Sequence, residues 1–179
     1  MNDFKNDFQW SNDQSKKDIS TIKTFYYNND VTNIRRSDES LDKKGVDYIV
    51  DLNNGKKETY DVKRRKQGSN KYWKNGKPEI AVEIYSDTAR KKEGWTNTAN
   101  CDYFLFIFED CKKCFRIPAK LLSLTTHRFF EKWKREYGEK IQFNINNGSK
   151  YKSSCIFVPF DEVKVCCQSV AFDTKEEVI

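Results

Sequence analysis

The sequence predicts an α/β fold of the α+β kind, with a central sheet, flanking helices, and a C-terminal extension made of a helix and a β-hairpin. Three features indicate this fold. Alternating apolar and polar residues flank Asn53-Asn54-Gly55, as in a β-hairpin. The run after Asp102 is continuously apolar as far as residue 108, which is typical of a strand buried on both faces. Residues 118–137 place apolar side chains at helical spacing.

Length and composition predict one domain. A chain of 179 residues is long enough for one core and too short for two domains of ordinary size. Its 13 Phe, 9 Tyr and 4 Trp can bury large areas, which offsets a mean hydropathy of -0.89. No run approaches the roughly 18 apolar residues of a membrane span, and Met1–Trp10 lacks the apolar stretch of a signal peptide. We therefore expect a soluble cytoplasmic protein with a single core and no membrane partner.

The N-terminal third is expected to begin with a loose lead-in over residues 1–12. A helix is predicted over residues 13–27, because Ile19, Ile22 and the aromatic pair that follows them share one face. Residues 31–44 are charged and show no clear period. We predict no regular element there.

Four strands are expected to form the central sheet. Strands over 46–52 and 58–64 are joined at Asn53-Asn54-Gly55, because Asn and Gly accept the positive φ angles of a hairpin turn. Strands over 79–85 and 102–108 complete the sheet.

The sequence after residue 117 predicts the C-terminal extension of helix and hairpin. Pro118 opens a helix that runs to about Tyr137. A second hairpin over 141–145 and 154–158 and a short helix over 161–168 follow, before a polar tail.

Basic and aromatic residues interleave between positions 63 and 95. With a net charge of +6 and a pI near 8.9, this pattern favours a polyanionic partner, because cations replace counterions on phosphates and rings stack on bases. A solvated surface is the alternative, and for Trp95 the alternative is packing in the core. The candidate nucleic-acid contacts are Arg64, Arg65, Lys66, Lys71, Trp73, Lys74, Arg90, Lys91, Lys92 and Trp95.

The six cysteines are expected to be mostly reduced. Cys111 and Cys114 have the spacing of a zinc knuckle, but a tetrahedral site needs a second pair of ligands, and only Cys155 or Cys166-Cys167 could supply it. We therefore expect a hairpin turn flanked by two half-buried thiols rather than a structural Zn²⁺ site.

Asp61 and Lys63 carry the main chemical signal. They lie two residues apart on a predicted strand, so both side chains project from one face while Val62 points into the core. Asp47 enters from the neighbouring strand of the hairpin. Two converging carboxylates form a hard oxygen site that suits Mg²⁺ or Mn²⁺ better than zinc. With a lysine to position water or stabilise the transition state, this set suits phosphodiester hydrolysis.

These residues resemble the signature of the PD-(D/E)XK nuclease superfamily, which includes restriction enzymes and Holliday-junction resolvases. Gly45-Val46-Asp47 matches its first half and Asp61-Val62-Lys63 its second, with a hairpin between them. Val46 replaces the proline of the signature, which leaves the metal ligand unchanged. The resemblance is closest to phage-type members and covers about residues 13–108.

The resemblance implies a restriction endonuclease-like core: a mixed sheet of four to five strands between helices. Residues 13–117 would form this core within a single domain 1–179, and residues 118–179 would pack on it as the extension. The metal, Mg²⁺ or Mn²⁺, would be held by Asp47, Asp61 and the backbone carbonyl of Val62.

One further acidic ligand is expected and stays open among three candidates. Many members of the superfamily place an acid on the helix before the first strand, which Asp18 fits better than Glu39 in the loop that follows. Glu83 lies on the third predicted strand, where it is a ligand, a residue that orients Lys63, or an exposed strand residue.

The leading functional hypothesis is a Mg²⁺-dependent DNA endonuclease of phage or mobile-element origin, with DNA favoured over RNA. One site per small subunit favours a two-fold homodimer for double-strand cleavage. The alternative is a catalytically silent module that binds nucleic acid or protein on a nuclease fold, such as a phage inhibitor of host defence. A zinc-stapled binding domain is a weaker third hypothesis.

Overall fold

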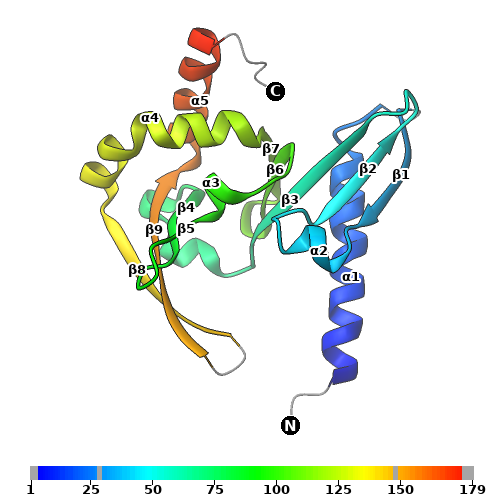
Figure 1. Ribbon diagram of the computed structural model, residues 1–179, viewed down its shortest axis with the longest axis horizontal. Helices are drawn as coiled ribbons and strands as arrows, with labels where there is room; N and C mark the ends of the chain where they lie inside the picture. The colour runs from blue at the N-terminus through cyan, green and yellow to red at the C-terminus, as the bar shows by residue number, and fades with distance from the viewer. Residues whose placement is uncertain (1–3, 28–29, 147–148, 175–179) are drawn as a thin grey trace.

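Two β-sheets packed with helices make up the fold (Figure 1). The computed structural model describes residues 4–27, 30–146 and 149–174, and for residues 4–12, 72, 74, 146, 149 and 174 it describes the backbone alone. The predicted α+β class, with a mixed five-stranded sheet flanked by helices and a C-terminal helix, is confirmed. The helices in the described residues are α1 (Phe4–Lys23), α2 (Glu39–Asp42), α3 (Trp95–Thr98), α4 (Ala119–Tyr137) and α5 (Phe160–Thr174).

The five-stranded sheet carries the predicted site. Its order is β1-β2-β3-β6-β7, and β3 pairs parallel with β6 while the other neighbours are antiparallel. The parallel step is possible because the intervening chain leaves this sheet to build part of a second one. The strands are β1 (Val31–Arg36), β2 (Tyr48–Leu52), β3 (Lys57–Arg65), β6 (Tyr103–Phe108) and β7 (Lys113–Pro118).

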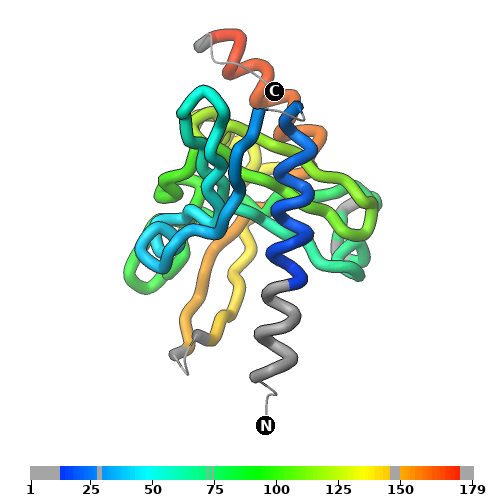
Figure 2. The backbone as a smooth tube through the Cα atoms, turned by 90° about the vertical axis from the view of Figure 1, so that its right-hand side faces the viewer, coloured from blue at the N-terminus to red at the C-terminus, as the bar shows by residue number. Residues whose placement is uncertain are grey.

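The second sheet is antiparallel and has the order β5-β4-β9-β8. It consists of β4 (Glu79–Asp87), β5 (Lys92–Glu93), β8 (Glu139–Asn146) and β9 (Ser149–Pro159). The β8–β9 hairpin projects from the body of the protein, as two views at right angles show (Figures 1 and 2). The 3-10 turns η1 (Ser69–Tyr72), η2 (Lys74–Gly76) and η3 (Glu109–Cys111) lie in the connections.

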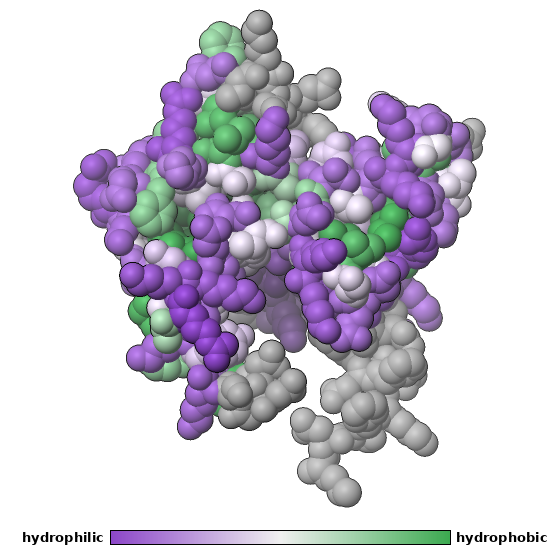
Figure 3. Space-filling model, viewed as in Figure 1, coloured by the Kyte–Doolittle hydropathy of each residue, from purple (hydrophilic) through white to green (hydrophobic). Residues whose placement is uncertain are grey.

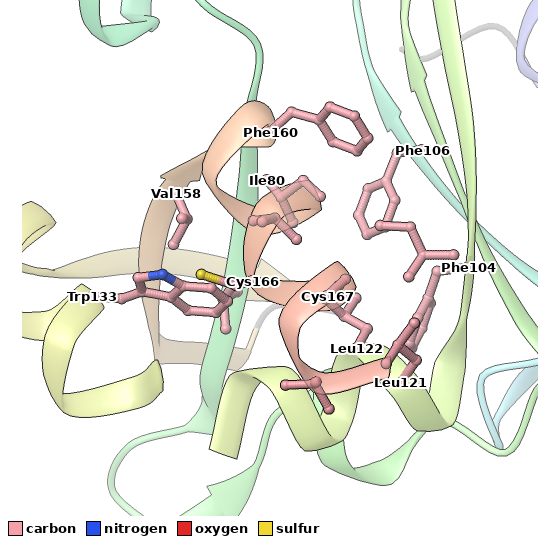
Figure 4. Packing of buried hydrophobic residues seen from close by; sticks show 14 of the residues in the cluster. Ile80, Phe104, Phe106, Leu121, Leu122, Trp133, Val158, Phe160, Cys166 and Cys167 are labelled. Atoms are coloured by element: carbon pink, nitrogen blue, oxygen red, sulfur yellow. The ribbon is translucent and has the colours of Figure 1, made fainter. Parts of the chain in front are cut away.

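The buried residues form two clusters where a single core was expected, and β6 contributes to both. Phe104, Phe106 and Phe108 join the larger cluster with the second sheet, α4 and α5. Leu105 and Ile107 project to the other face, where they pack with α1 and with β2 and β3. The predicted burial of this strand on both faces is therefore confirmed. Figure 4 shows side chains of the larger cluster converging from the second sheet, β6, α4 and α5.

The sheet position predicted for residues 79–85 is wrong. The strand forms, but it pairs with β5 and β9 and not with β3 or β6. Its first residue Glu79 lies opposite Pro159 near the C-terminal end of the chain. A strand's partner depends on long-range packing that its own periodicity does not encode.

The bounds of the N-terminal elements also differ from the prediction. The first helix begins at Phe4 and ends at Lys23, instead of spanning 13–27. The hydroxyl of Thr24 donates to the Thr21 carbonyl at 2.7 Å, a local bond that competes with continued helix. Residues 31–36, predicted to be irregular, form β1; this edge strand lacks alternation in burial and contains a register shift near Asn33.

The later elements follow the prediction with longer bounds. The strands of the second hairpin span 139–146 and 149–159, and the last helix extends to Thr174. The end of the polar tail, residues 175–179, lies outside the described residues. Among the described helices, none combines the length and apolar character needed to cross a membrane.

Short contacts fix α3 against β4. They thereby fix the position of Trp95, the first residue of α3. The Gly94 N–H donates to the Ile84 carbonyl at 2.9 Å, and the Thr96 hydroxyl donates to the Glu83 carbonyl at 2.8 Å. A Cβ on Gly94 would lie 2.1 Å from the Glu83 carbonyl oxygen, which is far inside van der Waals contact. Only glycine fits this crossing.

We predict that Gly94→Ala lowers the free energy of unfolding by about 3 kcal/mol or more, because the backbone of β4 or α3 must shift. Gly55→Ala is the matched control: Gly55 has φ of +80° but no atom near its added Cβ. That change should lower stability by only about 1 kcal/mol. Urea denaturation measures both, and equal losses would contradict the tight crossing.

Candidate active site

The register of the β2–β3 hairpin brings Asp47 and Asp61 to one face. Tyr48 pairs with Tyr60, and the N–H of Asp47 donates to the Tyr60 carbonyl at 2.7 Å. Asp47 thus lies opposite Asp61 just before β2 begins. Directly opposed residues of an antiparallel pair project to the same side. The side chain of Asp47 accepts the N–H of Val62 at 2.7 Å, which fixes the carboxylate beside β3.

Lys63 completes the cluster from the same face of β3. Its ammonium lies 2.7 Å from Oδ1 of Asp61 and 4.8 Å from the centre of the Trp95 ring. Trp95 packs edge-on against Phe104 at 4.8 Å between ring centres, so its position is fixed by the larger cluster. The structure therefore brings together Asp47, Asp61 and Lys63, the three residues predicted to be catalytic.

Burial gives the two carboxylates unusual acidities. The pKa of Asp47 is raised from 3.8 to about 6, mainly by burial; the Val62 N–H and Lys63 oppose the rise, and the charge of Asp61 contributes to it. Burial also raises the pKa of Asp61, against the lowering effect of the Lys63 ammonium. The carboxylate of Asp42 at the end of α2 raises the pKa of both. The site thus concentrates more negative charge than Lys63 offsets.

One oxygen of this cluster lacks a partner. Asp61 is only 2% exposed, and its Oδ2 has no hydrogen-bond partner among the described residues. A buried acceptor left unpaired is costly unless a ligand satisfies it. A cation would pair with this oxygen and relieve the repulsion between the carboxylates, so the residues fit a divalent metal ion.

The small number of protein ligands suits Mg²⁺ or Mn²⁺. Within the described parts of the chain, no three Asp, Glu, His or Cys side chains converge at metal-ligand spacing. A cation between Asp47 and Asp61 would therefore take its other ligands from backbone carbonyls, water and substrate. That is how Mg²⁺ commonly binds, with one or two carboxylates and several waters. The carbonyl of Val62 follows Asp61 directly on β3 and is the backbone ligand that the motif resemblance implies.

Gly45 packs closely against Ala99 and Asp61. It has φ of +77°, and an added Cβ would lie 3.0 Å from the Cβ of Ala99 and 3.5 Å from Oδ2 of Asp61. The residue must be glycine both for its left-handed backbone and for this close approach. The loop from α2 and the segment after α3 consequently meet over the acidic pair.

The three acids left open as further ligands lie apart from this cluster. Asp18 is on the opposite face of the sheet, where it accepts the Tyr48 hydroxyl at 2.9 Å and pairs with Arg64. Glu39 is exposed on α2 and pairs with Lys43 at 2.7 Å. The carboxylate of Glu83 accepts the backbone N–H of Trp95 at 3.1 Å. It therefore contacts the residue whose ring lies against the Lys63 ammonium.

Two neighbours of the site had not been expected from the sequence. The charge of Asp42 raises the pKa of both carboxylates. Its only signal in the sequence is its position three residues before Gly45, whose N–H donates to the Asp42 carbonyl at 2.9 Å. Cys101 lies beside Asp61. Burial and the Asp61 charge raise the pKa of this thiol to about 12, so it stays protonated and is a poor nucleophile.

The residues predicted to contact nucleic acid are divided among several places. Arg65, Lys66 and Trp73 line a pocket of roughly 890 Å³. Arg64 borders the same pocket, but its guanidinium pairs with Asp18 and, at 2.8 Å, with Glu109.

The remaining predicted contacts lie elsewhere. Lys71 is exposed on η1, and Arg90, Lys91 and Lys92 are exposed around the β4–β5 turn. The side chain of Lys74 lies outside the described residues.

The Cys111–Cys114 segment forms the predicted hairpin turn with half-buried thiols. Cys111 packs against the larger cluster and donates to the Phe108 carbonyl at 3.8 Å. Cys114 packs against the smaller cluster, on the other face of the sheet.

We predict that Asp47→Asn stabilises the metal-free protein at neutral pH. The amide can still accept the Val62 N–H, but the charge that burial and Asp61 disfavour is gone. Because the folded pKa lies above the ordinary 3.8, this group lowers the stability of the wild type as pH rises from about 4 to about 6. The gain should thus be small near pH 4 and reach about 1–3 kcal/mol above pH 6.5.

Thermal melts in EDTA across this pH range measure the effect, and Mg²⁺ in place of EDTA should raise the melting temperature of the wild type but not of Asp47→Asn. Asp51→Asn, in the strand β2 that follows Asp47, is the control and should respond to Mg²⁺ as the wild type does. A variant that is less stable than the wild type at pH 7.5 would contradict the account of the acidic pair.

Comparisons with known proteins assign no family to this chain. No protein-family model, no curated protein and no solved structure matches it. The resemblance to the PD-(D/E)XK nucleases stays a prediction from motif spacing, and the chemistry of the site is argued from its own geometry.

Proposed function

We propose that the protein is a metal-dependent nuclease that hydrolyses phosphodiester bonds, with DNA as its substrate. One observation carries this proposal: the buried Oδ2 of Asp61 has no hydrogen-bond partner among the described residues, while Oδ1 of the same carboxylate contacts the Lys63 ammonium at 2.7 Å. A cation site adjoining a fixed lysine is the minimum equipment for stabilising charge on a phosphate.

The residues of the site divide the work. Asp47 and Asp61 would hold Mg²⁺ or Mn²⁺, which when bound lowers the pKa of a coordinated water and offsets charge on the phosphate. Lys63 donates hydrogen bonds at the edge of the pair, where it can orient the attacking water or a phosphate oxygen. Its ammonium is oriented by Asp61 and by the ring of Trp95.

The net charge of the chain supports a polyanionic substrate. The chain carries a net charge of +6 despite the local acidic pair. Hydrophilic side chains flank the hollow between the two halves of the face shown in Figure 3. A negatively charged backbone would be attracted to a chain of this net charge, and more so at low salt.

We predict that the purified protein nicks or linearises supercoiled plasmid in Mg²⁺ or Mn²⁺ and is inactive in EDTA. Asp61→Asn and Lys63→Ala should each lower the cleavage rate by about a hundredfold or more, because each removes a group that acts on the developing charge. Cleavage is followed on agarose gels.

Matched controls lie on the same β2–β3 hairpin. Lys57→Ala removes an exposed lysine from β3, and Asp51→Asn removes a carboxylate from β2; both should cut at close to the wild-type rate. Equal activity of Asp61→Asn and the wild type would refute the site. Salt-sensitive DNA binding by a wild type that leaves plasmid intact in both metals would instead identify a silent binding module.

A further inference from the structure

A large pocket opens further along β3 from the acidic pair. Asp61, Lys63 and Arg65 are every second residue of β3, so their side chains project from the same face of the strand. At the usual rise per residue, Arg65 lies about 13 Å beyond Asp61. The pocket is roughly 890 Å³ and is lined by β3, the η1–η2 segment, the end of α4 and the β8–β9 hairpin. A substrate strand that contacts the acidic pair can therefore continue into it.

Arg65 gives the pocket an unsatisfied donor. Its Nη2 is buried without a hydrogen-bond partner among the described residues, and its guanidinium lies 5.2 Å from the centre of the Phe157 ring. Burial lowers the pKa of Arg65, and the nearby Glu79 carboxylate opposes this effect. A guanidinium remains charged in proteins and can only donate hydrogen bonds. An acceptor atom of a ligand would therefore satisfy the Nη2 group of Arg65.

The other lining residues add positive charge and polar contacts. Lys66 and Lys140 are exposed at the pocket, so together with Arg65 they outnumber Glu79. Gln142, the next pocket residue on β8 after Lys140, adds an amide that can donate and accept. The lining thus suits an anion that also carries hydrogen-bonding groups.

Aromatic rings form the rest of the wall. Trp73 is half-buried with its ring edge-on to Phe108 at 6.0 Å, and Phe157 and Tyr137 also line the pocket. Flat rings next to cations bind nucleic-acid bases by stacking while the cations contact the phosphate. Neither an inorganic anion nor an apolar ligand would use both kinds of group.

We propose that this pocket binds one unstacked nucleotide of the substrate strand, with its base against the aromatic wall and its phosphate toward Arg65 and Lys140. The inference rests on the proposed function in taking nucleic acid as the substrate. It adds that the protein engages a single-stranded or locally opened segment rather than an intact duplex.

The test is fluorescence anisotropy with a fluorescein-labelled 12-nucleotide single strand and the corresponding 12-base-pair duplex, in EDTA so that nothing is cut. The wild type should bind the single strand more tightly. The double variant Lys140→Gln/Gln142→Ala, which alters two exposed positions, and Trp73→Leu should each weaken single-strand binding by about five- to hundredfold. Thermal melts verify that each variant is folded.

Lys150→Gln is the matched control. Lys150 lies on the same hairpin, but its partner in the ladder is Ile145, on the face opposite Lys140 and Gln142. This variant should change the affinity less than twofold. Inorganic polyphosphate as a competitor separates base binding from charge alone: Trp73→Leu should leave its affinity unchanged.

The pocket is refuted if the double variant binds the single strand as tightly as Lys150→Gln, or if the duplex binds as well as the single strand. The two proposals fail separately. Normal plasmid cleavage by a double variant with unchanged DNA affinity would refute the pocket alone. Pocket-dependent binding by a wild type that never cuts would refute the nuclease alone.

Discussion

The position of β3 between β2 and β6 is the constraint on which the rest of the structure depends. A strand paired on both sides cannot rotate, so the two-residue alternation of its side chains assigns each one to a fixed face. Tyr60 and Val62 point toward α1 and the smaller cluster. Asp61 and Lys63 point the other way. A shift of one residue in the pairing would exchange these sets and bury the wrong groups.

The two faces of β3 treat charge in opposite ways. On the α1 face Asp18 and Glu109 both contact the Arg64 guanidinium, so each carboxylate there is compensated by a direct ion pair and the group acts in packing. On the other face Asp47, Asp61 and Asp42 place more negative charge near one another than Lys63 offsets. A structural ion pair requires that each buried charge contacts an opposite charge. Carboxylates held close together with too few cations can instead bind a metal ion or take part in a reaction.

Much of the fold and part of the site could be predicted from local sequence. Strand alternation is enough to place Asp61 beside Lys63, and the Asn53-Asn54-Gly55 turn fixes the register that brings Asp47 opposite. Burial of β6 followed from its unbroken apolar run. These features depend on neighbours within a few residues or across one tight turn, where backbone geometry leaves few alternatives.

The remainder depends on contacts between distant parts of the chain. Residues 79–87 read as a strand, but their partner β9 lies near the C-terminus, and nothing in their own period distinguishes β9 from β3. The helical position of Asp18 did not show which face of the sheet α1 covers. Asp42 acts through space from a one-turn helix, so its influence depends on how the loop before Gly45 folds over the acidic pair. The pocket at Arg65 likewise needs β8 and β9, which no motif near β3 predicts.

The claim that Asp47 and Asp61 form a divalent cation site is tested most directly by a crystal structure of the protein grown with Mn²⁺, using anomalous scattering to locate the ion. One anomalous peak is expected within about 2.5 Å of carboxylate oxygens from both residues, including Oδ2 of Asp61. A map with Mn²⁺ at other carboxylates and none between Asp47 and Asp61 would contradict it.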